Sequence, residues 1–174
     1  MPYVSANRLL ARLRTAGSPP PAPPVRAALL AGLGGFSATL AMFSLADWSG
    51  VAFVMAPFGA SCVLAFALPE SPLSQPRNII GGHLIATGIG LAMMSLFGTS
   101  AAVMALAVGL AIAAMLATRT THAPAGANPL LVMLAGADWS FLVTPVLAGA
   151  VTLVCVAFLY HRCTGRSDYP RYWL

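Results

Sequence analysis

Charged side chains are scarce in this sequence. Its 174 residues include nine basic and four acidic side chains, 7% of the chain, whereas 59% of the residues are apolar. A soluble domain carries about 25% charged residues, so these charges are too few to cover the surface of a water-soluble fold. The composition therefore excludes a soluble globular domain, a disordered chain and a coiled coil, and it indicates a small polytopic membrane protein. Because the apolar runs are continuous rather than alternating, an all-α protein with spanning helices is predicted.

Lysine is absent, and all nine basic residues are Arg. In a soluble chain the net charge of +5 would suggest nucleic acid, but Arg in the loops of a membrane protein sets its orientation. Cysteine is also scarce: Cys62, Cys155 and Cys163 have no metal-ligand spacing and are interpreted as small apolar side chains. We therefore expect the lipid bilayer as a partner, with no nucleic acid, metal or cofactor.

The few charges divide the chain into three regions. Residues 1–25 form a basic segment, with Arg8, Arg12 and Arg14, followed by a proline-rich linker; residues 162–174 form a tail. The domain between them, residues 26–161, contains long uncharged stretches, and a spanning helix needs about 20 apolar residues. Six membrane segments are predicted, at about residues 27–46, 51–68, 79–97, 101–118, 123–137 and 141–160.

The arginines also predict the orientation. With the N-terminus inside, every Arg falls on an inner loop or terminal segment and none on an outer loop, as the positive-inside rule requires. Both termini are therefore expected in the cytoplasm, and the expected location is the inner (plasma) membrane of a bacterium. The alternative has four spans, with 51–68 and 123–137 as re-entrant loops, and it would place Arg77 and Arg119 outside.

An internal repeat accompanies these segments. Residues 56–61 (Ala-Pro-Phe-Gly-Ala-Ser) match residues 123–128 (Ala-Pro-Ala-Gly-Ala-Asn). Each motif follows one long span and precedes another, so the halves, about 26–97 and 98–161, each contain a span, a broken segment and a span. Because three crossings are an odd number, the second half is predicted to be inverted relative to the first, as in many transporters.

The Ala-Pro-x-Gly-Ala motif indicates a binding site. Pro removes a backbone donor and Gly relaxes the backbone, so a helix is expected to break at the motif and to resume near Ala60 and Ala127. Broken backbone in a bilayer is tolerated where protein buries it or where it lines a cavity. Two resuming helices would point N–H groups and partial positive charge at each other, which suits a small anion. The alternative is a kink that only aids packing.

Particular side chains are candidates for the anion pathway. His83 begins a span, where a polar group is costly without a partner. His122 precedes the second motif. Its imidazole is predicted to couple proton binding to anion binding, because a bound anion would strengthen proton binding and a bound proton would strengthen anion binding. Gly59 and Gly126 are expected to be backbone requirements. The predicted anion-binding residues are Pro57, Phe58, Gly59, Ala60, Ser61, His83, His122, Pro124, Gly126, Ala127 and Asn128.

The inner loops carry the remaining polar candidates. Glu70, the single Glu of the chain, and Arg77 form either an inner gate or a surface ion pair of little worth. Arg119 is expected in a wet cavity at the mouth of the anion site. The predicted gate and loop residues are Glu70, Gln75, Arg77, Asn78 and Arg119.

Residues 55–61, 68–83 and 122–128 together resemble the HPP family of integral membrane proteins, over about residues 26–160. The family is named for a His-Pro-Pro motif, which here is His122-Ala123-Pro124, so Ala replaces the first Pro. Its members are usually described with four spanning helices, fewer than the six segments predicted above. Members in plastids and cyanobacteria are linked to nitrite transport, so the resemblance implies a small-anion permease with nitrite as the expected anion.

Three functions compete at this point. The leading hypothesis is a transporter or channel for a small monovalent inorganic anion. An intramembrane enzyme lacks support, because the sequence has no His pair at metal spacing and no Gly-x-Ser-x-Gly nucleophile motif. The third is a structural or regulatory membrane subunit. We also expect a homo-oligomer, since the spans 27–46 and 101–118 are rich in small residues that allow close helix contact.

Overall fold

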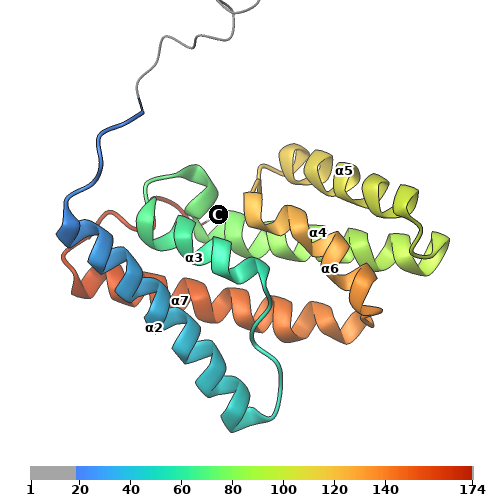
Figure 1. Ribbon diagram of the computed structural model, residues 1–174, viewed down its shortest axis with the longest axis horizontal. Coiled ribbons are helices and arrows are strands. Elements are labelled where there is room, and N and C mark those ends of the chain that lie inside the picture. Colours follow the sequence, from blue (N-terminus) through green and yellow to red (C-terminus); the bar gives the residue numbers. More distant parts are fainter. Residues whose placement is uncertain (1–18, 174) are drawn as a thin grey trace, which may run out of the picture.

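The computed structural model of the protein describes residues 19–173, and these residues form helices and loops with no strand. The predicted basic helix around Arg8, Arg12 and Arg14 lies outside the described residues. The six α-helices of the described part are α2 (Val25–Ser49), α3 (Pro57–Ala67), α4 (Pro76–Phe97), α5 (Ala101–Ala117), α6 (Asn128–Ala135) and α7 (Ala148–Cys163) (Figure 1). Four short turns complete them: η1 (Pro72–Ser74), η2 (Ala123–Ala127), η3 (Trp139–Leu142) and the π-helical η4 (Val143–Leu147).

The prediction of an all-helical membrane protein is confirmed. Three helical runs are long and apolar enough to cross a membrane: α2, α4 and the run Trp139–Cys163. Three others are apolar but shorter, namely α3, α5 and the run Ala123–Ala135. Each of the six predicted segments thus contains a helix, but the segment 51–68 has no regular structure before Pro57 and is helical only over Pro57–Ala67.

Local sequence explains where the helices begin and end. Pro76 occupies the first position of α4, where a missing N–H costs nothing, and Gln75 before it is extended. The Ser100 hydroxyl accepts a hydrogen bond from the backbone N–H of Val103 and caps α5. Gly50 and Gly136 end α2 and α6 in the left-handed region, with φ of 70° and 60°, which a residue without Cβ adopts easily. These caps define the lengths of the three long runs and the short helices between them.

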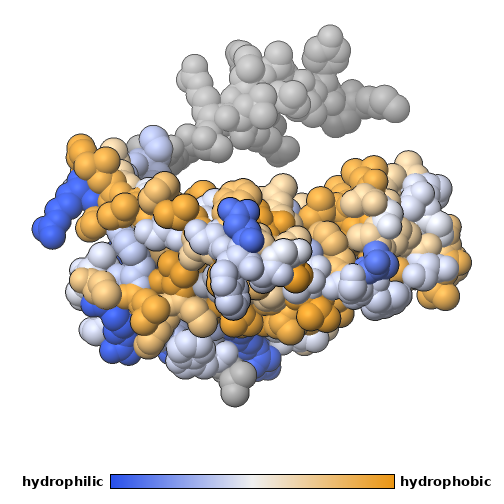
Figure 2. Space-filling model, turned by 90° about the horizontal axis from the view of Figure 1, so that it is seen from below, coloured by the Kyte–Doolittle hydropathy of each residue, from blue (hydrophilic) through white to orange (hydrophobic). Residues whose placement is uncertain are grey.

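The surface of the described part is largely apolar. Figure 2 shows hydrophobic side chains over most of one face, with hydrophilic residues in separate patches. On α2 the outward-facing side chains recur at helical spacing and include Leu29, Leu33, Phe36, Leu40 and Phe43. Such a surface suits lipid rather than water.

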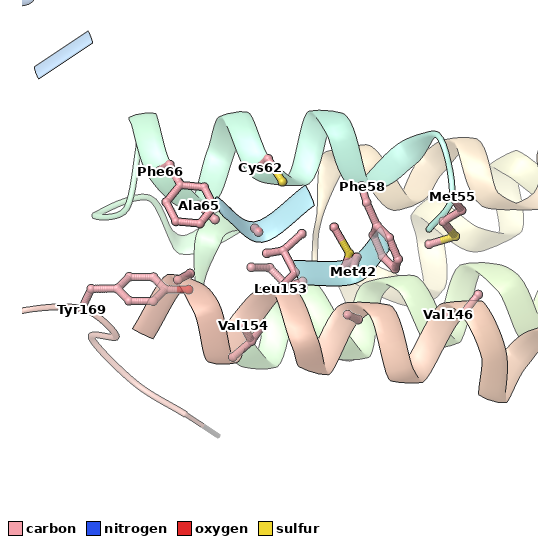
Figure 3. Close-up of a cluster of buried hydrophobic side chains, with 14 residues drawn as sticks. Met42, Met55, Phe58, Cys62, Ala65, Phe66, Val146, Leu153, Val154 and Tyr169 are labelled. Atoms are coloured by element: carbon pink, nitrogen blue, oxygen red, sulfur yellow. The ribbon is translucent and has the colours of Figure 1, made fainter. Parts of the chain in front are cut away.

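The main core lies between α2, α3 and α7. Phe58, Met42 and Leu153 are almost completely buried in it, and Figure 3 shows them between α3 and α7. Gly149 of α7 lies directly against the Phe58 ring and the backbone carbonyl of Phe53. The small residue therefore allows α7 to approach the start of α3 closely.

Two short helices start near the middle of the molecule. In Figure 1, α3 and α6 begin close to each other and run outward in opposite directions. The helix ends that carry arginines also contact one another: Arg166, after α7, forms an ion pair with Glu70, after α3, and Arg77 of α4 donates to the Thr118 carbonyl after α5. These contacts join the end of α7 to the end of α3 and the start of α4 to the end of α5.

Candidate functional site

The candidate site is a buried cluster centred on the hydroxyl of Ser61. Ser61 Oγ lies 2.8 Å from Nε2 of His83 and 2.8 Å from Nε2 of His122. Asn128 contacts the other nitrogen of His83, with 3.0 Å between Asn128 Nδ2 and His83 Nδ1, and Thr87 Oγ1 lies 2.8 Å from the same Nδ2. All five side chains are fully buried. A polar group of this size inside an apolar bundle is costly unless its hydrogen bonds are made.

Three regions of the chain supply the cluster. Ser61 lies one turn into α3, so its position follows from the helix start at Pro57. His83 and Thr87 are four residues apart on α4 and share one face of that helix. His122 precedes η2, and Asn128 is the first residue of α6. The two Ala-Pro-x-Gly-Ala motifs therefore meet at the cluster, because Ser61 directly follows the first motif and Asn128 directly follows the second.

The hydrogen bonds of the cluster run in one direction when both imidazoles are neutral. His122 Nδ1 lies 2.7 Å from the Leu73 carbonyl, which only accepts, so Nδ1 carries the hydrogen and Nε2 is an acceptor. The Ser61 hydroxyl then donates to His122, and its oxygen accepts from Nε2–H of His83. His83 Nδ1 is left as an acceptor, which the Asn128 amide N–H satisfies.

The amide orientation of Asn128 supports this assignment. Its Nδ2 also donates to the His83 carbonyl at 3.2 Å and faces Thr87 Oγ1. Reversing the amide would place its oxygen against the His83 carbonyl. It would also leave the single Ser61 hydrogen facing two acceptor nitrogens. The donor series therefore runs from Asn128 through His83, Ser61 and His122 to the Leu73 carbonyl, and two imidazoles and a hydroxyl are groups that pass protons.

Close packing holds the two imidazoles in place. The edge of Phe58 meets the His83 ring with 5.0 Å between centroids, and the His83 and His122 rings are 4.8 Å apart. Gly82 lies against His122: a Cβ there would stand 2.7 Å from His122 Cβ and 2.9 Å from the Thr120 carbonyl oxygen. Gly82, which precedes His83 in the sequence, thus permits α4 to approach the segment before η2 closely.

The structure brings together part of the predicted anion site. Ser61, His83, His122 and Asn128 form the cluster, Phe58 packs on it, and Ser61 Oγ lies 3.3 Å from the Pro57 carbonyl. Pro124 is buried in the second motif, whereas Gly59, Ala60 and Ala127 face outward and Gly126 is half-buried. The polar members of the prediction therefore converge, and the small residues of the motifs do not line the cluster.

Two expectations about the motif are wrong. Pro57 is the first residue of α3, so the first motif begins a helix instead of breaking one that resumes at Ala60. Pro is favourable there because its missing N–H has no partner in a helix anyway. Gly59 and Gly126 have no left-handed φ, and a Cβ at either would meet nothing within 4 Å. Neither glycine is required by its backbone conformation or by its neighbours.

We therefore expect Gly59→Ala to be tolerated. Ala removes backbone freedom inside α3 and should change the stability by about 0.5–1 kcal/mol in the favourable direction. Thermal unfolding of the purified protein in detergent would measure this change. A large loss of folded protein would instead show that another molecule packs closely on Gly59.

The loop residues form a different set of contacts from the predicted gate. Glu70 pairs with Arg166 at 3.1 Å and not with Arg77, and both partners are about half exposed. A hydrogen bond from the backbone N–H of Glu70 and the neighbouring Arg166 guanidinium lower the pKa of its carboxyl. An exposed pair of this kind contributes little to stability. A Glu70–Arg77 gate is therefore not present in this conformation.

Arg119 also departs from the prediction. Its side chain is exposed, and its backbone is in the left-handed region at φ 57°. It lies in the turn after α5 and has no hydrogen bond to the cluster among the described residues. His122 alone of this loop reaches Ser61, because the chain turns inward after Thr120.

The tail after α7 folds back over the loop between α3 and α4. Tyr169 is buried and its hydroxyl donates to the Ser74 carbonyl at 3.1 Å, and the Arg171 backbone N–H donates to Gln75 Oε1 at 2.8 Å. Asn78, the neighbouring predicted loop residue, donates to the Thr121 carbonyl. These bonds fix the loop that carries Leu73, the last acceptor of the donor series. His161, at the end of α7, is likewise buried, with Nε2 2.9 Å from the Ala65 carbonyl.

Sequence reasoning missed two members of the site. Thr87 lies one helical turn after His83, so its spacing was a usable signal. The Leu73 carbonyl had no signal, because a backbone group becomes an acceptor only through the fold of its loop. Within residues 19–173, no three His, Cys, Asp or Glu side chains gather in a geometry that holds a metal ion.

Comparison with known proteins decides the family. The family model "HPP, transmembrane region" matches residues 20–170. The chain belongs to the HPP family of membrane proteins. A transmembrane protein of Dictyostelium discoideum is 36% identical over 129 residues, which are 70% of this chain and 42% of the relative. A second one from the same organism is 37% identical over 124 residues, 67% of this chain and 44% of the relative.

These matches cover only part of each relative, so the function of a whole relative cannot be assigned to this chain. This chain spans less than half the length of either relative, and their names state only that they are transmembrane proteins. No solved structure matches the chain significantly. The comparisons therefore establish an HPP-family membrane protein, and its activity has to be argued from the cluster.

Proposed function

We propose that this HPP-family protein transports a small monovalent anion across the membrane, as a transporter or channel, and that the Ser61–His83–His122–Asn128 cluster is its polar centre. The observation that carries the proposal is the buried donor series itself. Ionisable side chains inside a membrane bundle are rare and usually mark pathways for ions or protons. The sequence offers no nucleophile motif or metal spacing for catalysis, so transport rather than an enzymatic reaction is proposed.

The cluster suits an anion because it is rich in donors. The Ser61 hydroxyl lies 2.8 Å from His83 Nε2, and the Asn128 amide nitrogen lies 3.0 Å from the other ring nitrogen of His83. The starts of α3 and α6 add partial positive charge at the same place. An anion that enters would take hydrogen bonds from these groups and would favour an extra proton on an imidazole. The proposal is therefore that the anion and a proton enter together.

We also propose that the six segments form two inverted halves, at about 26–97 and 98–161. α3 has 11 residues, about 16 Å at 1.5 Å per residue, which is half of a hydrocarbon core of about 30 Å. The extended residues before it would cover the other half. The opposite directions of α3 and α6 in Figure 1 support the inversion. Re-entrant short helices within a four-span bundle are the alternative topology.

The orientation proposed for these halves places the arginine-rich side in the cytoplasm, following the positive-inside rule. Six of the nine arginines lie in the described part, all in inner loops or at the helix ends beside them, and the contacts of Arg77 and Arg166 join those ends. The relatives from Dictyostelium discoideum place the family outside bacteria as well. A homo-oligomer through the small residues of the spans 27–46 and 101–118 remains part of the proposal.

A structural or regulatory subunit is the second candidate function. It is favoured by the saturation of the cluster, since every ring nitrogen of His83 and His122 has a partner and all five side chains are fully buried. A satisfied polar network can specify helix packing without any ligand. Flux through liposomes that contain only this protein separates the two functions.

The experiment is a flux measurement between about pH 5.5 and 8 in proteoliposomes, around the ordinary pKa of histidine near 6.5. Nitrite, nitrate, formate and chloride share a single charge and small size, and nitrite is the anion that the family resemblance suggests. We expect protein-dependent flux that rises as the pH falls, after correction for passive permeation of the neutral acid. Flux equal to that of protein-free liposomes for all four anions would favour the structural subunit.

The matched variant in this experiment is His122→Gln, which removes the titrating ring beside Ser61 but keeps a side chain of hydrogen-bonding character. We expect its remaining flux to lose the dependence on pH. If wild type and variant share one pH profile, His122 is not the group that couples proton to anion, and plain anion conduction is the better description.

A further inference from the structure

A pocket that includes two arginines in its lining lies away from the Ser61 cluster. It has a volume of about 360 Å³ and opens between the start of α2, the end of α3 and the end of α7. Its walls are part apolar, with Leu30 and Phe66, and part basic, with Arg26 and Arg166. No step of the proposed transport uses this pocket.

The start of α2 makes the pocket electropositive. Pro24 precedes the helix and provides no side-chain cap, and the first turn holds Arg26 and no acidic residue. The uncapped N–H groups of this 25-residue helix carry partial positive charge, and an arginine beside them adds a full charge. Helix starts normally favour acidic side chains, so an anion from outside the helix would be stabilised here.

A buried imidazole without a partner lies in the same wall. His161 is 2% exposed, and its Nε2 lies 2.9 Å from the Ala65 carbonyl. A carbonyl only accepts, so Nε2 carries the hydrogen, and the buried Nδ1 is left with no hydrogen-bond partner. An unsatisfied buried polar atom destabilises the fold. A ligand that carries both negative charge and a hydroxyl donor would satisfy the arginines and this nitrogen together.

We propose that this pocket binds a phosphate group, supplied by the headgroup of an anionic phospholipid or by free phosphate. Two guanidinium groups and a helix start are the usual donors to phosphate oxygens. Arg166 also pairs with Glu70 at 3.1 Å, so Arg26 supplies the uncompensated charge. The apolar wall of Leu30 and Phe66 accommodates the glycerol and the first acyl carbons of a lipid. Tyr160 already joins the helices there, since its hydroxyl donates to the Leu30 carbonyl at 2.7 Å.

The test is binding to the purified full chain in a neutral detergent, followed by native mass spectrometry and thermal unfolding. The probes are dioctanoyl phosphatidylglycerol, dioctanoyl phosphatidylcholine and inorganic phosphate. We expect phosphatidylglycerol to bind and to raise the melting temperature, and the Arg26→Gln/Arg166→Gln variant to bind it about tenfold more weakly, the effect of about 1.4 kcal/mol. The binding measurement is repeated with the single variant Arg26→Gln, because Arg26 is exposed and its replacement leaves the Arg166–Glu70 ion pair in place.

The matched control is Arg162→Gln/Arg171→Gln. It also removes two positive charges, but from residues that do not line the pocket. Arg162 lies over the Phe158 ring at 5.2 Å, and Arg171 contributes its backbone to Gln75. An equal loss of binding in both double variants would mean general attraction to a basic surface and would overturn the proposal, as would the absence of binding by any probe. Competition by inorganic phosphate would identify free phosphate as the source, and binding of phosphatidylglycerol alone would identify the lipid.

Discussion

Replacing Ser61 by Ala is expected to reduce anion flux by about tenfold or more. The Ser61 hydroxyl joins the two imidazoles, with 2.8 Å to each Nε2. Without it, the donor on His83 and the acceptor on His122 face each other across a space that the hydroxyl filled. Each unsatisfied buried group costs about 1–3 kcal/mol, and every 1.4 kcal/mol on a pathway is about tenfold in rate or affinity.

Two companion variants separate transport from folding. Ser61→Thr keeps a hydroxyl at the same position, and Thr is accepted in a helix, where its hydroxyl can also bond the preceding turn. We expect Thr to restore much of the flux that Ala removes. Ser95→Ala is the control, because the Ser95 hydroxyl donates only to the Leu91 carbonyl of its own helix. Its flux should equal that of wild type.

The measurement is uptake into proteoliposomes, with reconstituted protein quantified and melting temperature recorded for each variant. A Ser61→Ala protein that melts lower but transports at the wild-type rate would make the cluster a structural network. A variant that keeps its melting temperature and loses flux would place the hydroxyl in the transport pathway. These two results cannot be confused, because stability and flux are read from the same preparation.

The sequence predicted the helical segments well because their signal is local. Long apolar runs, Pro76 at the start of α4 and Gly50 and Gly136 at helix ends act within a few residues, so composition and spacing locate them. The repeat of the Ala-Pro-x-Gly-Ala motif further indicated that Ser61 and Asn128 belong to one site. The structure brings both into contact with His83.

The contacts between distant segments were beyond sequence reasoning. Glu70 and Arg77 were predicted to form an inner gate or a surface ion pair, but the fold brings Arg166 to Glu70 instead. The tail is a similar case: Tyr169 reaches Ser74 across 95 residues, and no spacing rule predicts that contact. An ion pair between loops depends on where helices end in space, which is decided by packing and not by separation along the chain.

The glycines illustrate the same difference. The motif glycines Gly59 and Gly126 stood out because they repeat, yet each has room for a Cβ. The glycines that the fold requires are inside helices with no motif around them, such as Gly90, where a Cβ would stand 2.7 Å from Pro129 Cα. Such a requirement comes from a neighbouring helix, so only the packed structure reveals it.

Gly149→Ala is therefore expected to be the most damaging glycine substitution. A Cβ at Gly149 would overlap with the carbonyl oxygen of Phe53 and with the Phe58 ring. The carbonyl belongs to backbone that cannot rotate away, and Phe58 is 1% exposed in the core and packs edge-on against His83. The methyl group must push α7 from the start of α3 or displace Phe58 from the cluster.

The expected size of the effect follows from overpacking. Extra methyl groups in a packed core cost about 1–3 kcal/mol, and contact with fixed backbone places this site at the upper end. For a chain of this length each kcal/mol lowers the melting temperature by about 2–4 °C, so a fall of about 10 °C is expected. Flux should fall as well, because Phe58 supports the His83 ring.

Gly109→Ala provides the matched control. Gly109 lies within α5, and a Cβ there would meet nothing within 4 Å. Ala is a better helix former than Gly by about 0.5–1 kcal/mol, so the control should melt at or slightly above the wild-type temperature. Equal melting temperatures for Gly149→Ala and Gly109→Ala would mean that α7 does not approach Phe53 and Phe58 as closely as described. The support of His83 by Phe58 would then need another explanation, since the same contact positions α3, α7 and the buried cluster relative to one another.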